Sequence, residues 1–366
     1  MKRLISTAIF IMIHLLIFRL YAQADGDDQS KIRLPYPASE YITDFQIDTL
    51  RNSIGHGDNW ANTWTNKDEI FSFFTDGKGF GSYITDPSSA PVAITGFPPD
   101  IEGKDTGVSI DHLTVYGSGK NGRKVCGLVM IRGILYAWVR NLNLPDSPKG
   151  TGSALIYSED YGKTWKWAEW NWPDIGYPVW LNAGKNYTAA QDEYAYFIAP
   201  NGPGAYADYP DMIMGRVKVS EILDKNCYRF FRKTTENEIS WDSYEYRTPV
   251  FTDSAGCFRP SLVYNPGIRK YLLSTCSSYG EWKWWSNKNT NRIAHLGIFE
   301  GDNPWGPWET VYYEKDWGKP ENRFAPNIPS KWISEDGTSF YLLYSCIPNG
   351  PYQFNIQKCT IRQGDN

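Results

Sequence analysis

The chain has 366 residues, of which 37 are Lys or Arg and 41 are Asp or Glu, so its formal net charge is -4. No basic tail or run of Lys and Arg stands out, which argues against a nucleic acid partner. Aromatic residues make up 16% of the chain, alongside 32 Gly and 23 Pro, a mixture that excludes a disordered chain, a coiled coil and a helical bundle.

The first segment has the pattern of a secretory signal peptide. A basic pair, Lys2 and Arg3, precedes a nearly uninterrupted apolar run over residues 5–17. We predict a signal peptide over residues 1–24 and an extended lead-in over residues 25–45. No later apolar run approaches the roughly 18 residues that a membrane span needs. We therefore expect a periplasmic or secreted protein with no membrane insertion after cleavage.

Short β-rich runs follow, separated by Gly, Pro, Asn and Asp. They include residues 70–74, 125–131, 134–139, 154–157, 194–198, 213–217, 270–274, 294–299 and 340–344. Strands of this length with turns between them predict an all-β sandwich, barrel or propeller. One short helix is expected over residues 219–225. No linker divides the chain, so we expect one domain over residues 46–366.

A turn motif favours the propeller. Residues 158–165 read SEDYGKTW, which fits S-x-D-x-G-x-T-W, the Asp-box. In this turn we expect Asp160 to accept backbone N–H bonds, Gly162 to adopt a positive φ and Trp165 to fill the blade. Residues 333–341 form a similar hairpin. The motif marks a fold rather than a catalytic site, and the chain length leaves five or seven blades open.

Six cysteines follow the predicted cleavage site. None forms a C-x-x-C pair and few His accompany them, so a structural zinc site is not expected. In an exported protein six Cys permit up to three disulfides. We favour a bond between Cys346 and Cys359, with buried free thiols as the alternative. No cofactor is predicted, although a Ca²⁺ ion at the centre is compatible with a propeller.

The densest group of candidate catalytic residues lies between residues 56 and 80. Asp58 stands in a Gly-Asp-Asn turn before one strand, and Asp76 follows the next strand. A hairpin between residues 62–64 and 70–74 brings the two carboxylates close in space. Carboxylates about 6.5–9.5 Å apart suit inverting glycoside hydrolysis, and about 5 Å suits a retaining route. Ordinary turn chemistry at both residues is the alternative.

Aromatic side chains flank this acidic pair. Trp60, Trp64 and Phe80 are predicted to shape a sugar site, because sugar rings stack on exposed aromatic faces. Packing of a β core is the competing role for all three residues.

The segments GDNWANTWTNKDEIFSFFTDGKGFG, NAGKNYTAAQDEYAYFIAP and FRPSLVYNPGIRKYLLST resemble, in order, bacterial proteins of the domain of unknown function 4185 family. The likeness runs from about residue 50 to residue 346. It implies a single five-bladed β-propeller with four-stranded antiparallel blades, related to arabinanase-like glycosidases. Some members are D-arabinofuranan hydrolases with a catalytic Asp pair, and Asp58 and Asp76 occupy the matching positions. His56 has no counterpart in that pattern, so the substrate stays open.

Five further residues are weaker candidates, each with a structural alternative. Asp192 and Glu193 begin a strand and are candidates to tune the acidic pair, or else form a solvated strand entry. Arg259 is a candidate clamp for a carboxylate or sulfate group. His56 and His112 are candidate general bases near neutral pH.

Three functions are compatible with these residues. The first is an exported glycoside hydrolase of bacterial polysaccharide degradation, with Asp76 as general acid and Asp58 as base or water activator. The second is a β-eliminating lyase or dehydratase acting on uronic-acid oligosaccharides of the ulvan type, with a His or Tyr base and an Arg. The third is a glycan-binding propeller without turnover. In each case the partner is an oligosaccharide or polysaccharide, and we expect a monomer.

Overall fold

The computed structural model describes residues 33–81, 83, 87–106, 122–143, 150–207, 209–235, 238–278, 294–317, 321, 323–346 and 352–364. The chain divides into two units, Met1–Leu34 and Pro35–Asn366, and all of the strands lie in the second. The predicted signal peptide and His112 lie outside the described residues, so both stay predictions.

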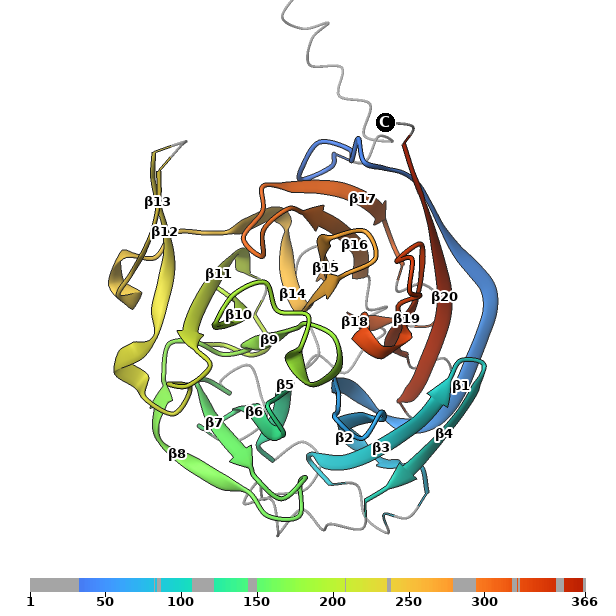
Figure 1. Cartoon of the computed structure of the whole chain (residues 1–366), viewed down its shortest axis with the longest axis horizontal. Helices are drawn as coiled ribbons and strands as arrows, with labels where there is room; N and C mark the ends of the chain where they lie inside the picture. Colours follow the sequence, from blue (N-terminus) through green and yellow to red (C-terminus); the bar gives the residue numbers. More distant parts are fainter. Residues whose placement is uncertain are drawn as a thin grey trace, which may run out of the picture. The chain divides into compact units, whose positions relative to one another are not determined.

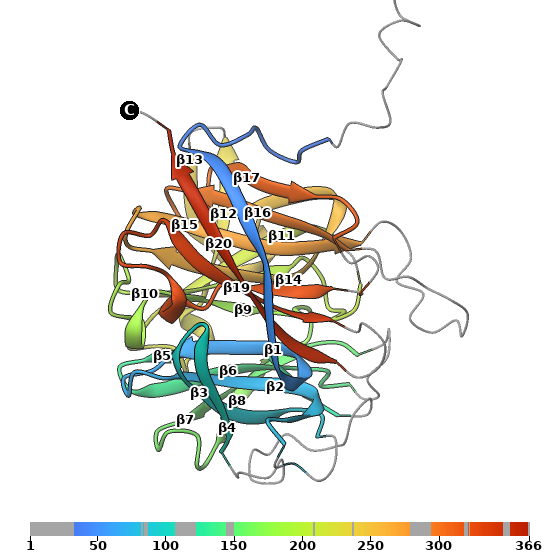
Figure 2. The same cartoon turned by 90° about the vertical axis from the view of Figure 1, so that its right-hand side faces the viewer.

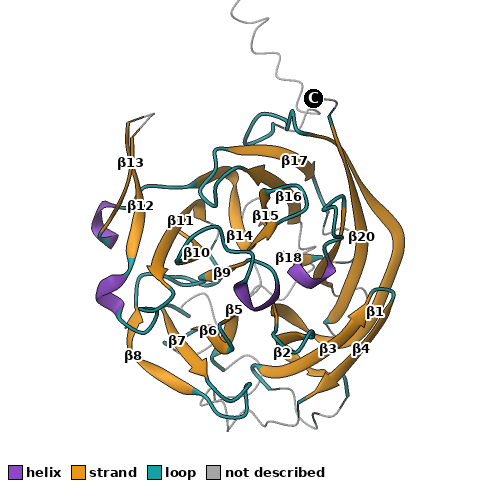
Figure 3. Ribbon diagram, viewed as in Figure 1, coloured by secondary structure: helices purple, strands orange, loops and turns teal. Residues whose placement is uncertain are grey.

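The described residues form β-strands and no α-helix (Figure 3), which confirms the predicted all-β class. The strands are β1 Ile42–Trp64, β2 Ile70–Gly79, β3 Ala90–Phe97, β4 Asp100–Asp105, β5 Lys124–Ile131, β6 Ile134–Arg140, β7 Ser153–Ser158, β8 Lys166–Trp172, β9 Val179–Asn182, β10 Tyr194–Pro200, β11 Tyr209–Lys218, β12 Arg229–Thr235, β13 Glu238–Asp242, β14 Phe251–Asn265, β15 Lys270–Ser278, β16 Ala294–Gly301, β17 Trp308–Glu314, β18 Phe324–Asn327, β19 Ser339–Cys346 and β20 Gln353–Gln363.

Short 3-10 turns are the only helical elements in the part of the chain that the structure describes. They cover Lys185–Tyr187, Lys225–Cys227, Tyr244–Tyr246 and Ser330–Trp332. The helix predicted over residues 219–225 is therefore wrong, because that segment forms turns that lead into Lys225–Cys227. Within the described ranges no helix has the length and apolar character that crossing a membrane requires.

The strands pair as successive meanders around a common centre. One sheet has the order β18-β19-β20-β1-β2-β3-β4, a second has β5-β6-β7-β8, and a third has β13-β12-β11-β10-β9-β14-β15-β16-β17. In Figure 1, β5, β9 and β18 lie toward the centre, whereas β4, β8, β13 and β17 lie at the rim. This arrangement within Pro35–Asn366 is that of a β-propeller.

A narrow central cavity confirms which strands are innermost. Its lining comes from β1, β5, β9 and β14 and from residues 327–328 at the end of β18, and its volume is about 10 Å³. A space of this size holds about one water molecule. A sugar ring does not fit there.

Strand β1 joins the two ends of the ring. Its first part pairs with β20, from Ile42 opposite Gln363 to His56 opposite Gln353, and its last part pairs with β2. Figure 2 shows β1 and β20 running side by side. Pairing of the first strand with the last leaves neither with an open edge, which stabilises a closed ring.

Much of the aromatic surplus packs the core. The largest fully buried side chains include Trp60, Trp138, Trp180, Trp317 and Trp332. The rings of Trp138 and Trp180 stack with centroids 5.1 Å apart. Burial of one large apolar side chain contributes roughly 1.5–3 kcal/mol, so these residues are explained by packing.

The Asp-box forms as predicted in the turn between β7 and β8. Asp160 Oδ1 accepts hydrogen bonds from Ser158 Oγ at 2.8 Å and from the Thr164 backbone N–H at 2.9 Å. Gly162 has a φ of 80°, and Trp165 is buried against the rings of Phe71 and Phe73.

The second hairpin repeats this chemistry around Asp336. Its Oδ1 accepts from Ser334 Oγ at 2.6 Å and from the Thr338 backbone N–H at 3.0 Å.

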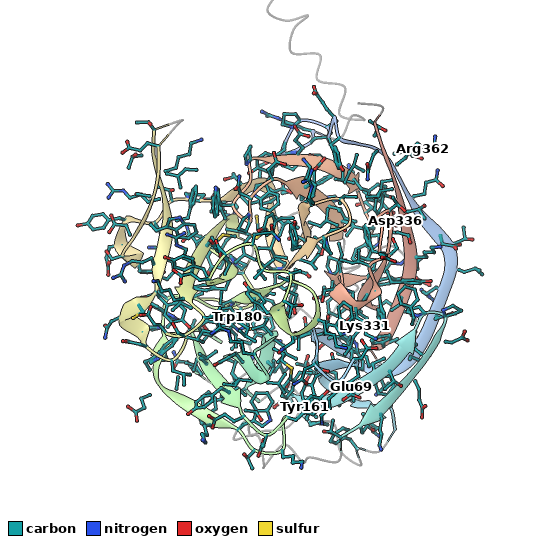
Figure 4. The ribbon with its side chains drawn as sticks, viewed as in Figure 1. Glu69, Tyr161, Trp180, Lys331, Asp336 and Arg362 are labelled. Carbon is teal, nitrogen blue, oxygen red and sulfur yellow. The ribbon has the colours of Figure 1, made fainter. Side chains whose placement is uncertain are left out.

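Tyr161, from the first turn, donates to Glu69 Oε1 at 2.5 Å, and Figure 4 shows these two side chains next to each other. The Asp-box therefore also ties the β5–β8 sheet to the β1–β2 hairpin.

The predicted disulfide between Cys346 and Cys359 is wrong. All six cysteines are free thiols. Cys346 pairs with Gln353, whereas Cys359 pairs with Phe340 at the other end of β19. Six residues of extended strand separate these positions by about 20 Å, so no bond between the two sulfur atoms is possible.

Candidate functional site

Polar side chains gather where the innermost strands begin. Lys124 is the first residue of β5, Tyr177 precedes β9, and Arg259 lies in β14. We name the group the inner-strand cluster, and its members are Asp58, Asn59, Thr75, Asp76, Lys124, Arg140, Tyr177, Tyr206 and Arg259. Residues far apart in sequence meet here because each meander starts at the same end of the ring.

Asp58 is held by its neighbours through one oxygen. Its Oδ1 accepts hydrogen bonds from Asn59 Nδ2 at 2.7 Å and from the Thr75 hydroxyl. The Asn59 backbone N–H in turn donates to Ser345 Oγ at 3.0 Å. Among the described residues none donates to Asp58 Oδ2. Asp58 is 2% exposed, and its carboxylate is oriented through Oδ1.

Asp76 is placed beside Asp58 by strand pairing. Asp58 is opposite Thr75 in the β1–β2 hairpin, and Asp76 is the next residue, so the two Asp residues occupy neighbouring backbone positions. Asp76 Oδ2 lies 2.5 Å from Lys124 Nζ, with side-chain exposures of 19% and 1%. This is the geometry of a charge-assisted hydrogen bond, and the ammonium favours the charged carboxylate.

Two buried arginines lie on the other side of the cluster. The guanidinium carbon of Arg259 lies 4.5 Å from the ring centroid of Tyr177 and 5.4 Å from that of Tyr206. Arg140 lies 5.5 Å and 4.8 Å from the same two rings. Burial raises the pKa of Tyr177, and the positive charges of Arg259 and Arg140 only partly oppose that rise.

Three cluster residues have left-handed backbone conformations. The φ angles are 54° for Asn59, 49° for Asp76 and 52° for Arg259. Asn and Asp tolerate this region, whereas an Arg there is strained. Such strain persists only where the surrounding structure fixes it, and it often accompanies a functional site.

Two of the predicted sugar-stacking residues, Trp60 and Phe80, pack against each other. Trp60 is 1% exposed; its Nε1 donates to Gly57 O at 3.0 Å, and its ring packs on Phe74 and Phe354. Phe80 is half-buried, with its ring 5.7 Å from that of Trp60. The stacking role predicted for Trp60 is not supported, because its ring has no face for a sugar.

Trp64 lies away from the cluster. It ends β1, six residues beyond Asp58, which corresponds to about 20 Å of extended strand. Its Nε1 donates to Asp68 Oδ1 at 2.9 Å, and the ammonium of Lys331 lies 5.4 Å from its ring centroid. Lys331, labelled in Figure 4, comes from the 3-10 turn before β19.

Asp192 and Glu193 also lie elsewhere. They precede β10, which runs antiparallel to β9, so they are at the opposite end of the inner strands from Tyr177. Asp192 accepts from the Tyr194 N–H and from the Tyr196 hydroxyl and lines a separate cleft of about 470 Å³. Glu193 pairs with the exposed Lys218. Neither residue contacts the Asp pair.

His56 is close to the cluster but engaged through one ring nitrogen. Its Nδ1 accepts a hydrogen bond from the Lys78 backbone N–H at 3.1 Å. With that bond in place the neutral ring carries its proton on Nε2, so neither nitrogen is ready to take a proton from a substrate.

Several cluster residues were not singled out in the sequence. Lys124 and Arg140 stand opposite each other at the ends of apolar strands β5 and β6. A charge at such a position is the available signal, since Lys and Arg are seldom fully buried without a reason. Tyr177 and Tyr206 offer no local signal, because their positions depend on how the meanders pack.

The described ranges contain no group of three or more His, Cys, Asp or Glu side chains close enough to hold a metal ion. The binding of a Ca²⁺ ion at the centre of the propeller stays a prediction.

Comparison with known proteins gives structural matches only. No protein-family model and no curated protein sequence matches the chain, so the resemblance to the domain of unknown function 4185 family is not confirmed. A candidate hydrolase from Bacteroides ovatus is similar in structure, with a TM-score of 0.51 and 12% identity, over 90% of this chain and 97% of that chain.

Two glycoside hydrolases of family GH43 are similar to the same extent. One is the GH43_1 enzyme from Xanthomonas citri, with a TM-score of 0.50 and 10% identity, over 85% of this chain and 90% of that chain. The other is a GH43 β-1,3-galactosidase solved with galactodeoxynojirimycin, with a TM-score of 0.50 and 10% identity, over 89% of this chain and 99% of that chain. At such identities the matches show a shared fold alone.

Proposed function

We propose that this protein is a glycoside hydrolase in which Asp58 and Asp76 carry the reaction. The observation on which this rests is the orientation of Asp58, whose Oδ1 accepts two hydrogen bonds while Oδ2 receives none from the described residues. Strand pairing sets Asp76 beside it. Two neighbouring carboxylates are what acid and base, or nucleophile, steps at a glycosidic bond require.

The contact with Lys124 bears on which residue does what. A general acid must carry a proton, whereas the ammonium 2.5 Å from Asp76 favours the charged carboxylate. We therefore assign the base or nucleophile role to Asp76 and proton donation, through Oδ2, to Asp58. This reverses the roles expected from the sequence.

Elimination is the second candidate, because Arg259 and Tyr177 lie together as a carboxylate neutraliser and a possible base. Two observations weigh against it. Burial raises the pKa of Tyr177. A higher pKa lowers the fraction of phenolate that is available as a base near neutral pH. His56 already uses Nδ1 as an acceptor. Hydrolysis is therefore the better supported reaction.

The fold supports the same proposal. Two of the similar structures bear the names of GH43 enzymes, and fold likeness raises the expectation of glycan chemistry without establishing it. The pairings of the sheets fit five meanders, which start at β1, β5, β9, β14 and β18. We interpret them as the five blades of one propeller and the substrate as an oligosaccharide or polysaccharide.

We also propose that the protein is exported and acts as a monomer. The basic and apolar N-terminal pattern supports export. N-terminal sequencing of the mature protein tests it, with cleavage near Ala24 expected and an intact Met1 as the contrary result.

The Asp pair is tested by kinetics on a panel of furanose-containing and uronate-containing oligosaccharides. Asp58→Asn and Asp76→Asn are each expected to lower kcat/KM by at least about 100-fold, a usual cost of losing an acid or base. Asp68→Asn is the matched control, because Asp68 is exposed in the turn at the other end of the same hairpin. Equal activity of all three variants would show that the pair is not catalytic.

A further inference from the structure

We propose that Arg259, with Arg140, Tyr177 and Tyr206, forms a subsite for an acidic group on the glycan, either a carboxylate or a sulfate ester. This inference rests on the proposed function, since it concerns the glycan that the same cluster binds. It names the substrate class: an anionic polysaccharide or oligosaccharide.

The first argument is the burial of an uncompensated charge. Arg259 is 2% exposed, and its Nε and Nη1 have no hydrogen-bond partner among the described residues. No Asp or Glu of the described ranges forms an ion pair with it. A buried cation with no counter-charge costs several kcal/mol. An anion supplied by a ligand offsets that cost.

The second argument is that a second cation faces the same rings. Arg140 is 1% exposed, and its guanidinium lies within 5.5 Å of the ring centroids of Tyr177 and Tyr206, as does that of Arg259. Positive charge is therefore concentrated around two tyrosines. Arg is the residue best suited to carboxylate and sulfate groups, because its planar fork can bind two oxygens at once.

The third argument is the link to the carboxylate pair. The Tyr177 hydroxyl donates to Asn59 Oδ1 at 3.3 Å, and Asn59 Nδ2 donates to Asp58 Oδ1. Tyr177, whose ring both arginines contact, is thus linked to Asp58 through Asn59. A sugar residue at Asp58 is expected to bring its own acidic group, or that of its neighbour, to Arg259.

Arg216 is an arginine outside the inner-strand cluster that also packs on aromatic rings. Its guanidinium lies 4.1 Å from the ring centroids of both Tyr194 and Trp241, but the residue is half-exposed on β11. Its Nε is buried without a hydrogen-bond partner, but the side chain as a whole is more exposed than that of Arg259. Arg216 resembles Arg259 in aromatic packing and differs in burial, so it is a matched control.

The test is calorimetric titration of the full chain carrying Asp58→Asn, at low ionic strength, with glucuronate, glucose 6-sulfate and glucose as probes. At least one acidic sugar is expected to bind 10-fold or more tightly than glucose. Arg259→Met is expected to abolish this preference, whereas Arg216→Met keeps it. A preference for glucuronate alone identifies a carboxylate site, and a preference for glucose 6-sulfate alone identifies a sulfate site.

Equal binding of glucose and both acidic sugars would overturn the inference, as would an Arg259→Met protein that keeps the preference. Should Arg259→Met fail to fold, Arg259→Lys keeps the charge but loses the fork, and a weaker preference is expected. Acidic preference without any hydrolysis by the wild type contradicts the proposed function and leaves the subsite standing. Hydrolysis of neutral glycans, together with equal binding of acidic and neutral sugars, supports the proposed function and overturns the acidic subsite.

Discussion

The ammonium of Lys124 lies 2.5 Å from Oδ2 of Asp76, and the two residues belong to different sheets. Lys124 begins β5, and Asp76 lies near the end of β2. The pair therefore joins two neighbouring meanders at the point where the proposed chemistry takes place. Its geometry links the stability of the ring to the charge of one candidate catalytic residue.

A double-mutant cycle measures this link. Because Lys124 is almost fully buried, Lys124→Met and Asp76→Asn are expected to show a coupling free energy of about 2 kcal/mol in urea unfolding. The exposed pair Lys166 and Glu159, with 61% and 55% exposed side chains, is the control, and its coupling is expected to be much weaker because water and salt screen exposed charges. Equal coupling in both cycles would contradict a structural role for the buried pair.

Thr75 is predicted to position Asp58 for catalysis. Thr75→Val removes the hydroxyl that donates to Asp58 Oδ1 while keeping the size of the side chain. We expect kcat to fall about 10-fold or more with little change in KM, since misplacement of a reacting group acts on the chemical step. Thr75→Ser restores the donor and is expected to recover most of kcat. A change in KM with kcat unaltered would assign Thr75 another role. So would a Thr75→Ser variant that does not recover kcat.

The Asp-box predicts a pH dependence of stability. Burial opposes the shift, but hydrogen bonds from the Thr164 side chain and backbone and from Ser158 lower the pKa of Asp160 to about 2. A folded pKa below the unfolded one contributes stability above about pH 4, and that stability is lost as the pH falls toward 2. Asp160→Asn is expected to reduce the free energy of unfolding at pH 7 by about 1 kcal/mol, as at other side-chain caps.

Urea unfolding at a series of pH values between 7 and 2 checks this expectation. The difference in the free energy of unfolding between the wild type and Asp160→Asn should narrow as the pH falls through 4. Glu159→Gln, at the neighbouring exposed residue, is the control. Its free energy of unfolding is expected to differ from that of the wild type by less than about 0.5 kcal/mol, as for other surface changes. A gap that is constant with pH would show that the Asp160 charge does not stabilise the turn.

The thiols give a prediction that is independent of function. All six cysteines are free, and five of them are buried. Titration with a thiol reagent in denaturant, without reductant, should therefore count six thiols. In the native protein only Cys227, which is half-buried, should react quickly. A count of four or fewer would reveal a disulfide and contradict the strand register of β19 and β20.

Local patterns in the sequence are enough to predict the hairpin on which Asp58 and Asp76 lie. Residues 62–64 and 70–74 form the expected hairpin, because strands separated by a short polar segment pair with their neighbours. The Asp-box at residues 158–165 is likewise local, since Asp160 bonds only to residues within four positions of it. Such features depend on a few adjacent residues and need no knowledge of the whole ring.

The rest of the site depends on contacts across the ring. Lys124, Tyr177 and Arg259 meet Asp58 and Asp76 only after separate meanders have packed together, so no spacing in the chain predicts these partners. The incorrect disulfide has a different cause, since the register of the β19–β20 hairpin places Cys346 and Cys359 about 20 Å apart along its strands.

The most direct test of the proposed hydrolysis is mass spectrometry of the products formed in ¹⁸O-labelled water. From the oligosaccharide that the wild type cleaves, we predict one labelled oxygen in the product pair, and loss of product formation in both Asp58→Asn and Asp76→Asn. An unlabelled, unsaturated uronate that absorbs ultraviolet light, formed equally by the variants, would contradict hydrolysis by this pair of carboxylates.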